Sequence, residues 1–231
     1  MLDLDGIVFD KDGTLFDFAA TWEAWAVAFL DRLTQGDRAR AVEIGARVGF
    51  DYENQNFALS SVVIAGTPAE VADALLPLLP GQDRAALIEM LNEEASAAPQ
   101  AEAVPLAGFL DGLRARGLRL GVATNDAEAP ARAHLEKAGV VNRFDFIAGF
   151  DSGHGAKPGP GPLNAFLAQT GLRPERVAMV GDSLHDLEAG RRAGMVTIAV
   201  LTGLASAETL APKADLILPD IGHIPGVLAP K

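Results

Sequence analysis

The spacing of hydrophobic residues changes near residue 17 and again near residue 99. The apolar run at 7–9 predicts a buried strand, and it stops at the acidic turn Asp10-Lys11-Asp12-Gly13. From Asp17 to Ala98 the apolar residues instead recur at helical spacing, and no strand-like run interrupts them. We therefore predict an all-helical block inserted directly after the first strand.

Local signals predict four helices in this block. Apolar residues recur at i, i+3, i+4 and i+7 over 22–33, and a second helix is predicted over 39–48. A third begins at Thr67, because Thr67-Pro68-Ala69-Glu70 combines an N-cap residue, proline at the first helical position and a capping-box glutamate. A fourth is predicted over 83–95.

The second half of the chain alternates between strand and helix patterns. Predicted strands lie at 118–123, 146–148, 177–180, 196–200 and 216–218. Predicted helices, each followed by glycine, lie at 106–116, 127–138, 162–170 and 187–193. This alternation predicts an α/β fold with a doubly wound, mostly parallel sheet. The proline-rich tail from Pro219 is predicted to be a surface extension.

Composition narrows the choice of compartment and partner. The 231 residues suffice for one large domain or for a main domain with a smaller one, and they include no cysteine, which excludes disulfides and a cysteine nucleophile. A net charge of −12 argues against a nucleic-acid partner. The N-terminus does not resemble a signal peptide, and the longest uncharged run, 193–207, is shorter than the roughly 20 residues that span a bilayer. We expect a soluble, cytoplasmic monomer or homodimer with no membrane partner.

Polar side chains that can carry chemistry follow several of the predicted core strands. They are Asp10, Asp12, Thr124, Asn125, Lys157, Asp182 and Asp186. The carboxyl ends of the strands form the ligand-binding edge of an open α/β sheet, so these side chains are expected to gather there. Each has a purely structural explanation when taken alone, such as a turn or a helix cap. Together, four carboxylates would repel one another, and a bound Mg²⁺ is the natural counter-charge.

A family resemblance rests on these same residues. In chain order, Asp10-Lys11-Asp12-Gly13-Thr14, then Thr124, then Lys157-Pro158, then Gly181-Asp182-Ser183 with Asp186 closely resemble the four motifs of the haloacid dehalogenase superfamily. The helical insertion resembles the α-helical cap of its phosphoglycolate phosphatase-like enzymes. The resemblance implies a Rossmann-like core from 1–16 and 99–231, a cap from 17–98, and Mg²⁺-dependent phosphoryl transfer through an aspartyl-phosphate.

The resemblance also implies a role for each motif residue. Asp10 would be the nucleophile, and Asp12 the general acid for the leaving group and then the base for water. Thr124 and Lys157 would complete the catalytic set by contacting the phosphoryl group. The residues implied to bind phosphate are Gly13, Thr14, Thr124, Asn125 and Lys157. The metal ligands would be Asp10, the backbone carbonyl of Asp12 and Asp182, while Asp186 would complete that shell or orient Lys157.

The expected substrate is a small phosphate ester such as phosphoglycolate, and other functions stay open. Halide-removing relatives usually lack an acid at the position of Asp12, which favours phosphate esters here. A sugar-phosphate mutase shares the core motifs, and fold-level analogy does not separate it from a phosphatase. A receiver-like switch gathers similar residues, although its motif order differs and it has no place for the helical insertion. A degenerate, non-catalytic phosphate-binding protein is a further alternative.

Specificity is expected to come from the cap, which closes over the site in capped members. Trp22 and Trp25 either contact the substrate or pack in the cap core, which their helical spacing favours. Three arginines of the second cap helix are interpreted as a solvated face, unless one of them meets a substrate carboxylate: Arg38, Arg40 and Arg47. His185, inside the last motif, is expected to point away from the site.

Overall fold

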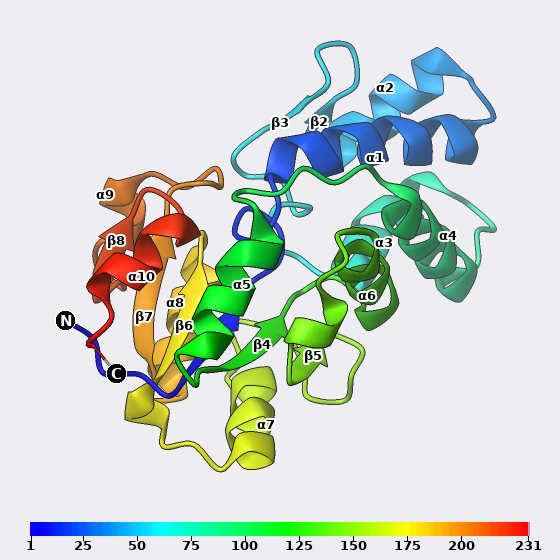
Figure 1. The fold of residues 1–231 in the computed structure, drawn as a ribbon. Coiled ribbons are helices and arrows are strands. Elements are labelled where there is room, and N and C mark those ends of the chain that lie inside the picture. The colour runs from blue at the N-terminus through cyan, green and yellow to red at the C-terminus, as the bar shows by residue number, and fades with distance from the viewer. Residues whose placement is uncertain (231) are drawn as a thin grey trace.

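The computed structural model describes residues 1–230, and its core is a six-stranded parallel sheet (Figure 1). The strands are β1 (Gly6–Phe9), β4 (Arg119–Ala123), β5 (Phe146–Ala148), β6 (Val177–Gly181), β7 (Val196–Val200) and β8 (Leu216–Leu218). Their order is β5-β4-β1-β6-β7-β8, so β1 has a parallel neighbour on each side. All four residues of β1 are buried, which explains its continuous apolar sequence. The predicted doubly wound α/β fold is confirmed.

Helices cover both faces of this sheet, because successive strand residues point to opposite sides. Ile7 and Phe9 belong to the hydrophobic cluster on one face, together with residues of α5 (Leu106–Ala115) and α10 (Ile224–Val227). Val8 belongs to the cluster on the other face. The helices that pack there are α7 (Gly161–Thr170) and α8 (Leu184–Arg192). The remaining core helices are α6 (Glu128–Lys137) and α9 (Ala207–Leu210).

The segment between β1 and α5 forms a separate helical layer with its own hydrophobic core (Figure 1). Its helices are α1 (Phe18–Thr34), α2 (Arg38–Arg47), α3 (Pro68–Leu75) and α4 (Arg84–Ala97). The structure contains the capping box predicted at Thr67, with Glu70 returning a hydrogen bond to the N-cap backbone. In the core of this layer, the rings of Trp25 and Phe29 stack with centroids 5.4 Å apart. We call residues 17–98 the helical insert.

The helical insert also contains a short strand pair that the sequence did not predict. β2 (Phe50–Asp51) and β3 (Asn56–Phe57) pair antiparallel, and their phenylalanine rings lie 4.7 Å apart. Strands of two residues are too short to show alternation in the sequence. In addition, α8 begins three residues earlier than predicted, because Ser183 caps it and Asp186 forms a capping box in its first turn.

The C-terminal tail is part of the core rather than the predicted surface extension. Ile221, Ile224 and Leu228 are buried in the cluster under α5. The tail also pairs with the N-terminus, since Leu2 N donates to Val227 O at 2.8 Å and Leu2 O accepts from Ala229 N at 2.8 Å. The apolar residues of the tail are few and lie among prolines and glycines. They show no periodicity that would have predicted this packing.

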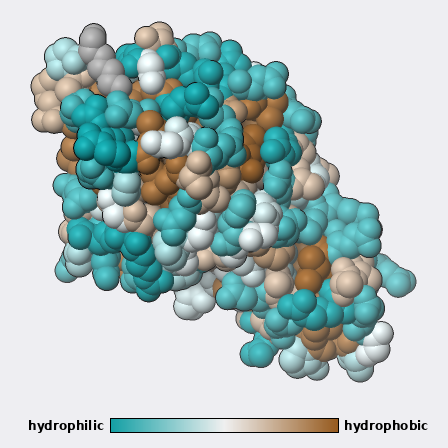
Figure 2. All heavy atoms as spheres, turned by 90° about the horizontal axis from the view of Figure 1, so that it is seen from below, coloured by the Kyte–Doolittle hydropathy of each residue, from teal (hydrophilic) through white to brown (hydrophobic). Residues whose placement is uncertain are grey.

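The outer surface is mainly polar where Figure 2 shows it. Hydrophilic residues predominate on this face, and the hydrophobic residues form separate small patches. Within residues 1–230, every helix is too short or too polar to cross a membrane.

Candidate active site

Three neighbouring strands end at the same edge of the sheet and carry predicted site residues there. Asp10 follows β1, Thr124 follows β4, and Asp182 follows β6. The last residue of β1 is opposite Val122 and Val180, so the chain leaves all three strands at one level. This is the carboxyl edge, where ligands bind in open α/β sheets.

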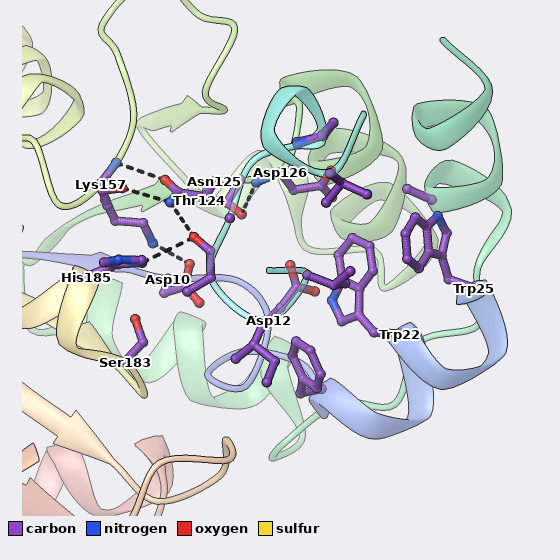
Figure 3. A pocket seen from close by; sticks show the side chains of 18 of the residues that line it. Asp10, Asp12, Trp22, Trp25, Thr124, Asn125, Asp126, Lys157, Ser183 and His185 are labelled. Atoms are coloured by element: carbon purple, nitrogen blue, oxygen red, sulfur yellow. Dashed lines mark hydrogen bonds and ion pairs between the residues drawn. The ribbon is translucent and has the colours of Figure 1, made fainter. Parts of the chain in front are cut away.

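A cavity lies between this edge and the helical insert, and its empty space of about 640 Å³ includes a part that is open to solvent. Its polar wall comes from the core and contains Asp10, Asp12, Thr124, Asn125, Asp126, Lys157, Asp182, Ser183, His185 and Asp186. Its other wall comes from the insert and is mostly apolar. Figure 3 shows the two walls facing each other, with Asp10 and Lys157 on one side and Trp22 and Trp25 of α1 on the other.

Lys157 bridges two of the predicted acids. Its Nζ lies 2.5 Å from Asp10 Oδ1 and 2.6 Å from Asp186 Oδ1. Burial alone would lower the pKa of Lys157, but these two carboxylates raise it above its ordinary value, so the side chain is charged. Asp186 is held in turn by Ser183, which donates to Asp186 Oδ2 from its backbone N at 3.0 Å and from Oγ at 2.6 Å. Both oxygens of Asp186 therefore have partners, and one of these partners is the Lys157 ammonium group.

Three carboxyl groups at this edge, those of Asp10, Asp182 and Asp186, share one cation, Lys157. Burial raises the pKa of Asp10 to about 7 against the effect of Lys157, and Asp186 and Asp12 add to the increase. Burial, together with the charges of Asp186 and Asp10, raises the pKa of Asp182 well above its ordinary range. Carboxylate oxygens of Asp10, Asp182 and Asp186 lie within 4.8 Å of one another. This crowded oxygen set fits a divalent cation such as Mg²⁺, and Asp10 and Asp182 are the carboxylates best placed to hold it.

Two glycines leave space for the carboxylate of Asp182. A Cβ at Gly203 would lie 1.7 Å from Asp182 Oδ2, and one at Gly13 would lie 2.5 Å from the same atom. Gly13 also has a φ of +76°, which glycine adopts without strain. Gly13 was predicted to bind phosphate, which stays a prediction; in the structure Gly13 and Gly203 both leave room for Asp182.

Asp12 belongs to a second, deeper polar cluster that the sequence analysis missed. Lys11, between the two acids of the first motif, has a side chain that is 0% exposed. Its Nζ lies 2.7 Å from Asp12 Oδ1, 3.3 Å from Asp126 Oδ2 and 3.0 Å from His134 Nδ1. Burial alone would lower the pKa of Lys11, but Asp12 and Asp126 raise it, so the ammonium group is charged. Lys11 thus holds the carboxylate of Asp12 from beneath the cavity.

His134 extends this cluster to the helical insert. Its Nε2 lies 2.6 Å from the backbone oxygen of Ala95 in α4. Burial, aided by the charge of Lys11, lowers the pKa of His134 to about 4, so the ring is neutral near pH 7. With its hydrogen on Nε2, the ring donates to Ala95 and accepts from Lys11 at Nδ1. Lys11 lies between two acids in the sequence, which could have indicated a buried ion pair. No signal indicated His134, because it is 123 positions away from Lys11.

Asn125 connects the insert to the backbone of Lys157. Its Nδ2 donates to Ala65 O at 2.8 Å and to Lys157 O at 2.9 Å, while its Oδ1 accepts from Lys157 N at 2.9 Å. These contacts occupy the side chain that was predicted to bind phosphate, which leaves its backbone N–H for that purpose. Thr124 Oγ1 accepts from Asp126 N at 3.1 Å, and its hydroxyl hydrogen can still donate into the cavity.

The structure also locates Thr14, His185 and the two tryptophans, for which the sequence analysis stated expectations. Thr14, predicted to contact phosphate, is fully buried outside the cavity lining, and its hydroxyl has no partner within residues 1–230. His185, expected to point away, lines the cavity with Nδ1 3.2 Å from Ala65 O. Trp22 and Trp25 are buried and also line the cavity, so core packing and substrate contact are both available to them.

The arginines of α2 lie outside the cavity lining, as the solvated-face interpretation predicts. Arg38 lies 3.3 Å from Glu53, Arg40 pairs with Glu43, and Arg47 donates to the backbone oxygen of Ala74. They therefore offer no positive charge to a substrate in this structure.

Comparison with known sequences places this chain among established hydrolases. The profile of the haloacid dehalogenase-like hydrolase family matches residues 4–194. A protein named probable phosphatase IndB, from Dickeya dadantii, is 28% identical over 93% of this chain and 88% of its own length. A phosphoglycolate phosphatase from Rhodospirillum rubrum is 39% identical, although that alignment spans about half of each chain, 50% of this one and 48% of the relative.

Solved structures share the fold at low sequence identity. A predicted phosphoglycolate phosphatase from Haemophilus somnus superposes with a TM-score of 0.73 at 20% identity, over 98% of this chain and 99% of the other. A β-phosphoglucomutase from Clostridium difficile superposes with a TM-score of 0.67 at 17% identity, over 96% and 93% of the two chains. A phosphatase and a mutase thus share this architecture, and the likeness extends to the fold alone.

Proposed function

Because the chain belongs to the haloacid dehalogenase-like hydrolases, we propose that it is an Mg²⁺-dependent phosphatase that hydrolyses a small phosphate monoester through an aspartyl-phosphate. The observation that carries this proposal is the position of Asp10. Its buried carboxylate ends the central strand, contacts Lys157 at 2.5 Å and lies within 4.8 Å of Asp182. Phosphoryl transfer depends mainly on positioning and on stabilisation of negative charge, and this edge supplies both.

Asp10 and Asp12 act in both half-reactions of this mechanism. In the first, a carboxylate oxygen of Asp10 bonds to phosphorus as the bond to the alcohol oxygen breaks, and Asp12 gives its proton to that oxygen. In the second, Asp12 takes a proton from water as the water oxygen attacks phosphorus, which frees Asp10 and releases phosphate. Lys11 positions Asp12 for both steps, through their 2.7 Å contact.

Charge stabilisation comes from both sides of the phosphoryl group. Lys157 contacts Asp10 directly and balances its charge, and the Thr124 hydroxyl is available to a phosphoryl oxygen. Mg²⁺ held by Asp10 and Asp182 would supply the remaining positive charge. The helical insert, residues 17–98, would act as a cap that excludes water and contacts the alcohol, over a core formed by 1–16 and 99–231.

Phosphate release with and without metal tests this proposal. A panel of phosphate esters is assayed with Mg²⁺ and with a chelator, and Asp10→Asn serves as the matched variant because it keeps the size of the side chain. We expect metal-dependent release that Asp10→Asn abolishes. Substantial release by Asp10→Asn would contradict the nucleophile assignment. Transfer of the phosphoryl group to a second sugar hydroxyl, without release, would support the mutase alternative.

A further inference from the structure

The wall that faces the leaving group is apolar and lacks basic side chains. It includes Phe18, Trp22, Trp25, Val63, Val71 and Leu91. Among the residues that line the cavity, Lys157 is the one lysine or arginine, and its ammonium group is already held by Asp10 and Asp186. A carboxylate on the alcohol part of a substrate would therefore be buried against this wall without a cationic partner. Burial of an unpaired charge is unfavourable in free energy.

Two buried polar atoms in the same wall have no partner in the described part of the chain. Trp22 is 8% exposed, and its Nε1 has no hydrogen-bond partner within residues 1–230. The neighbouring Trp25 differs, since its Nε1 donates to Leu91 O at 3.2 Å. Asn92, which also lines the cavity, has a buried Oδ1 without a partner in the same range. Buried indole N–H groups and amide oxygens are normally paired, and these two atoms are therefore available to a ligand that offers them an acceptor and a donor.

Trp22 lies close to the reacting end of the cavity. Lys11 Nζ is 5.6 Å from the centroid of the Trp22 ring and 2.7 Å from Asp12 Oδ1, which brings the indole near the general acid. Figure 3 shows the indole nitrogen on the side of the ring that faces Asp12. An acceptor on the alcohol, near the ester oxygen, would meet this N–H.

Building on the proposed phosphatase function, we propose that the alcohol part of the substrate is a neutral, planar heteroaromatic group rather than a short carboxylate such as glycolate. A carbonyl or ring nitrogen on this group accepts from Trp22 Nε1, and an N–H donates to Asn92 Oδ1. Its ring is buried against Trp22, Trp25 and Leu91, which favours binding through apolar contact.

Three primary-alcohol esters test this inference: the phosphate of a hydroxymethyl-2-pyridone, benzyl phosphate and 2-phosphoglycolate. The pyridone ester has both a donor and an acceptor, the benzyl ester has neither, and phosphoglycolate carries a carboxylate. We expect kcat/KM to fall in that order. Trp22→Phe should lower the ratio of kcat/KM for the pyridone ester over the benzyl ester by about tenfold, the effect of one hydrogen bond. Trp25→Phe is the matched control and should leave the ratio unchanged, because its N–H is paired inside the protein.

A binding measurement separates this inference from the reaction itself. The chain has two tryptophans, and both line the cavity, so quenching of their fluorescence reports ligand entry. In the Asp10→Asn protein we expect the pyridone ester to bind more tightly than 2-phosphoglycolate. If no ester is hydrolysed but this binding order holds, the proposed function fails and the inferred ligand class stands. Preference for 2-phosphoglycolate, a ratio unaffected by Trp22→Phe, or no binding of any ester would overturn the inference.

Discussion

His134 gives the structure a pH-dependent stability that can be predicted in direction and size. The ring is buried between Lys11 of the core and Ala95 of the insert, with contacts of 3.0 Å and 2.6 Å. Two substitutions remove its titration and each retains one contact. His134→Gln can still donate to the Ala95 oxygen, whereas His134→Asn can still accept from Lys11.

The magnitude follows from the difference between the folded and unfolded pKa of His134. The folded pKa is about 4, below the ordinary value of 6.5, because burial and the charge of Lys11 disfavour the protonated ring. The unfolded chain therefore binds more protons between these two values, so the contribution of His134 to stability is complete above pH 6.5 and is lost as the pH falls towards 4. Between about pH 7.5 and about pH 5, linkage gives a loss of about 2 kcal/mol from this residue.

Urea unfolding at these two pH values measures the effect. We expect the free energy of unfolding of the wild-type protein to fall by about 2 kcal/mol more than that of either His134 variant. Other titrating groups contribute to all three proteins and cancel in the comparison. His154→Gln, at an exposed loop position, is the surface control and should behave as wild type. Equal losses in the wild type and both variants would refute the buried, neutral His134.

Two further predictions concern the metal and the catalytic lysine. Gly203→Ala places a Cβ against Asp182 and should raise the Mg²⁺ concentration for half-maximal activity by about tenfold or more, seen in a metal titration. Gly108→Ala is its control, because a Cβ there meets no atom within 4 Å, and an unchanged metal requirement in Gly203→Ala would contradict the role of Asp182. Lys157→Met should lower kcat by about 10²–10³ while circular dichroism shows a folded protein. A loss of less than about tenfold would remove Lys157 from the charge-stabilising role.

Much of the fold was predictable because its signals are local. The run at 7–9 predicted β1, and Thr67 with Glu70 predicted the start of α3. The tail was predicted wrongly, because burial of Ile221 and Ile224 depends on α5 and on the N-terminal segment rather than on their own spacing. Tertiary packing decides such short segments, and periodicity does not report it.

The sequence could predict only those site residues that directly follow core strands. The edge of the sheet brings Asp10 and Asp182 together, as the order of strands and motifs predicts. The contact between Lys11 and His134 joins residues 123 positions apart and depends on how α6 meets the strand ends, which no local pattern indicates. The Trp22 N–H, which has no partner among residues 1–230, likewise cannot be identified until every neighbouring side chain is located.

The most direct test of the account is detection of a covalent phosphoenzyme on Asp10. Asp12→Ala should slow both half-reactions, but an ester with a good leaving group, such as 4-nitrophenyl phosphate, needs no proton in the first. An acid-quenched reaction of this variant with such an ester and Mg²⁺ should therefore accumulate the intermediate. Peptide mass spectrometry is then expected to show one added phosphoryl group on the peptide that contains Asp10, and none in Asp10→Asn. A protein that releases phosphate in a burst but never carries the label on Asp10 would contradict the aspartyl-phosphate mechanism.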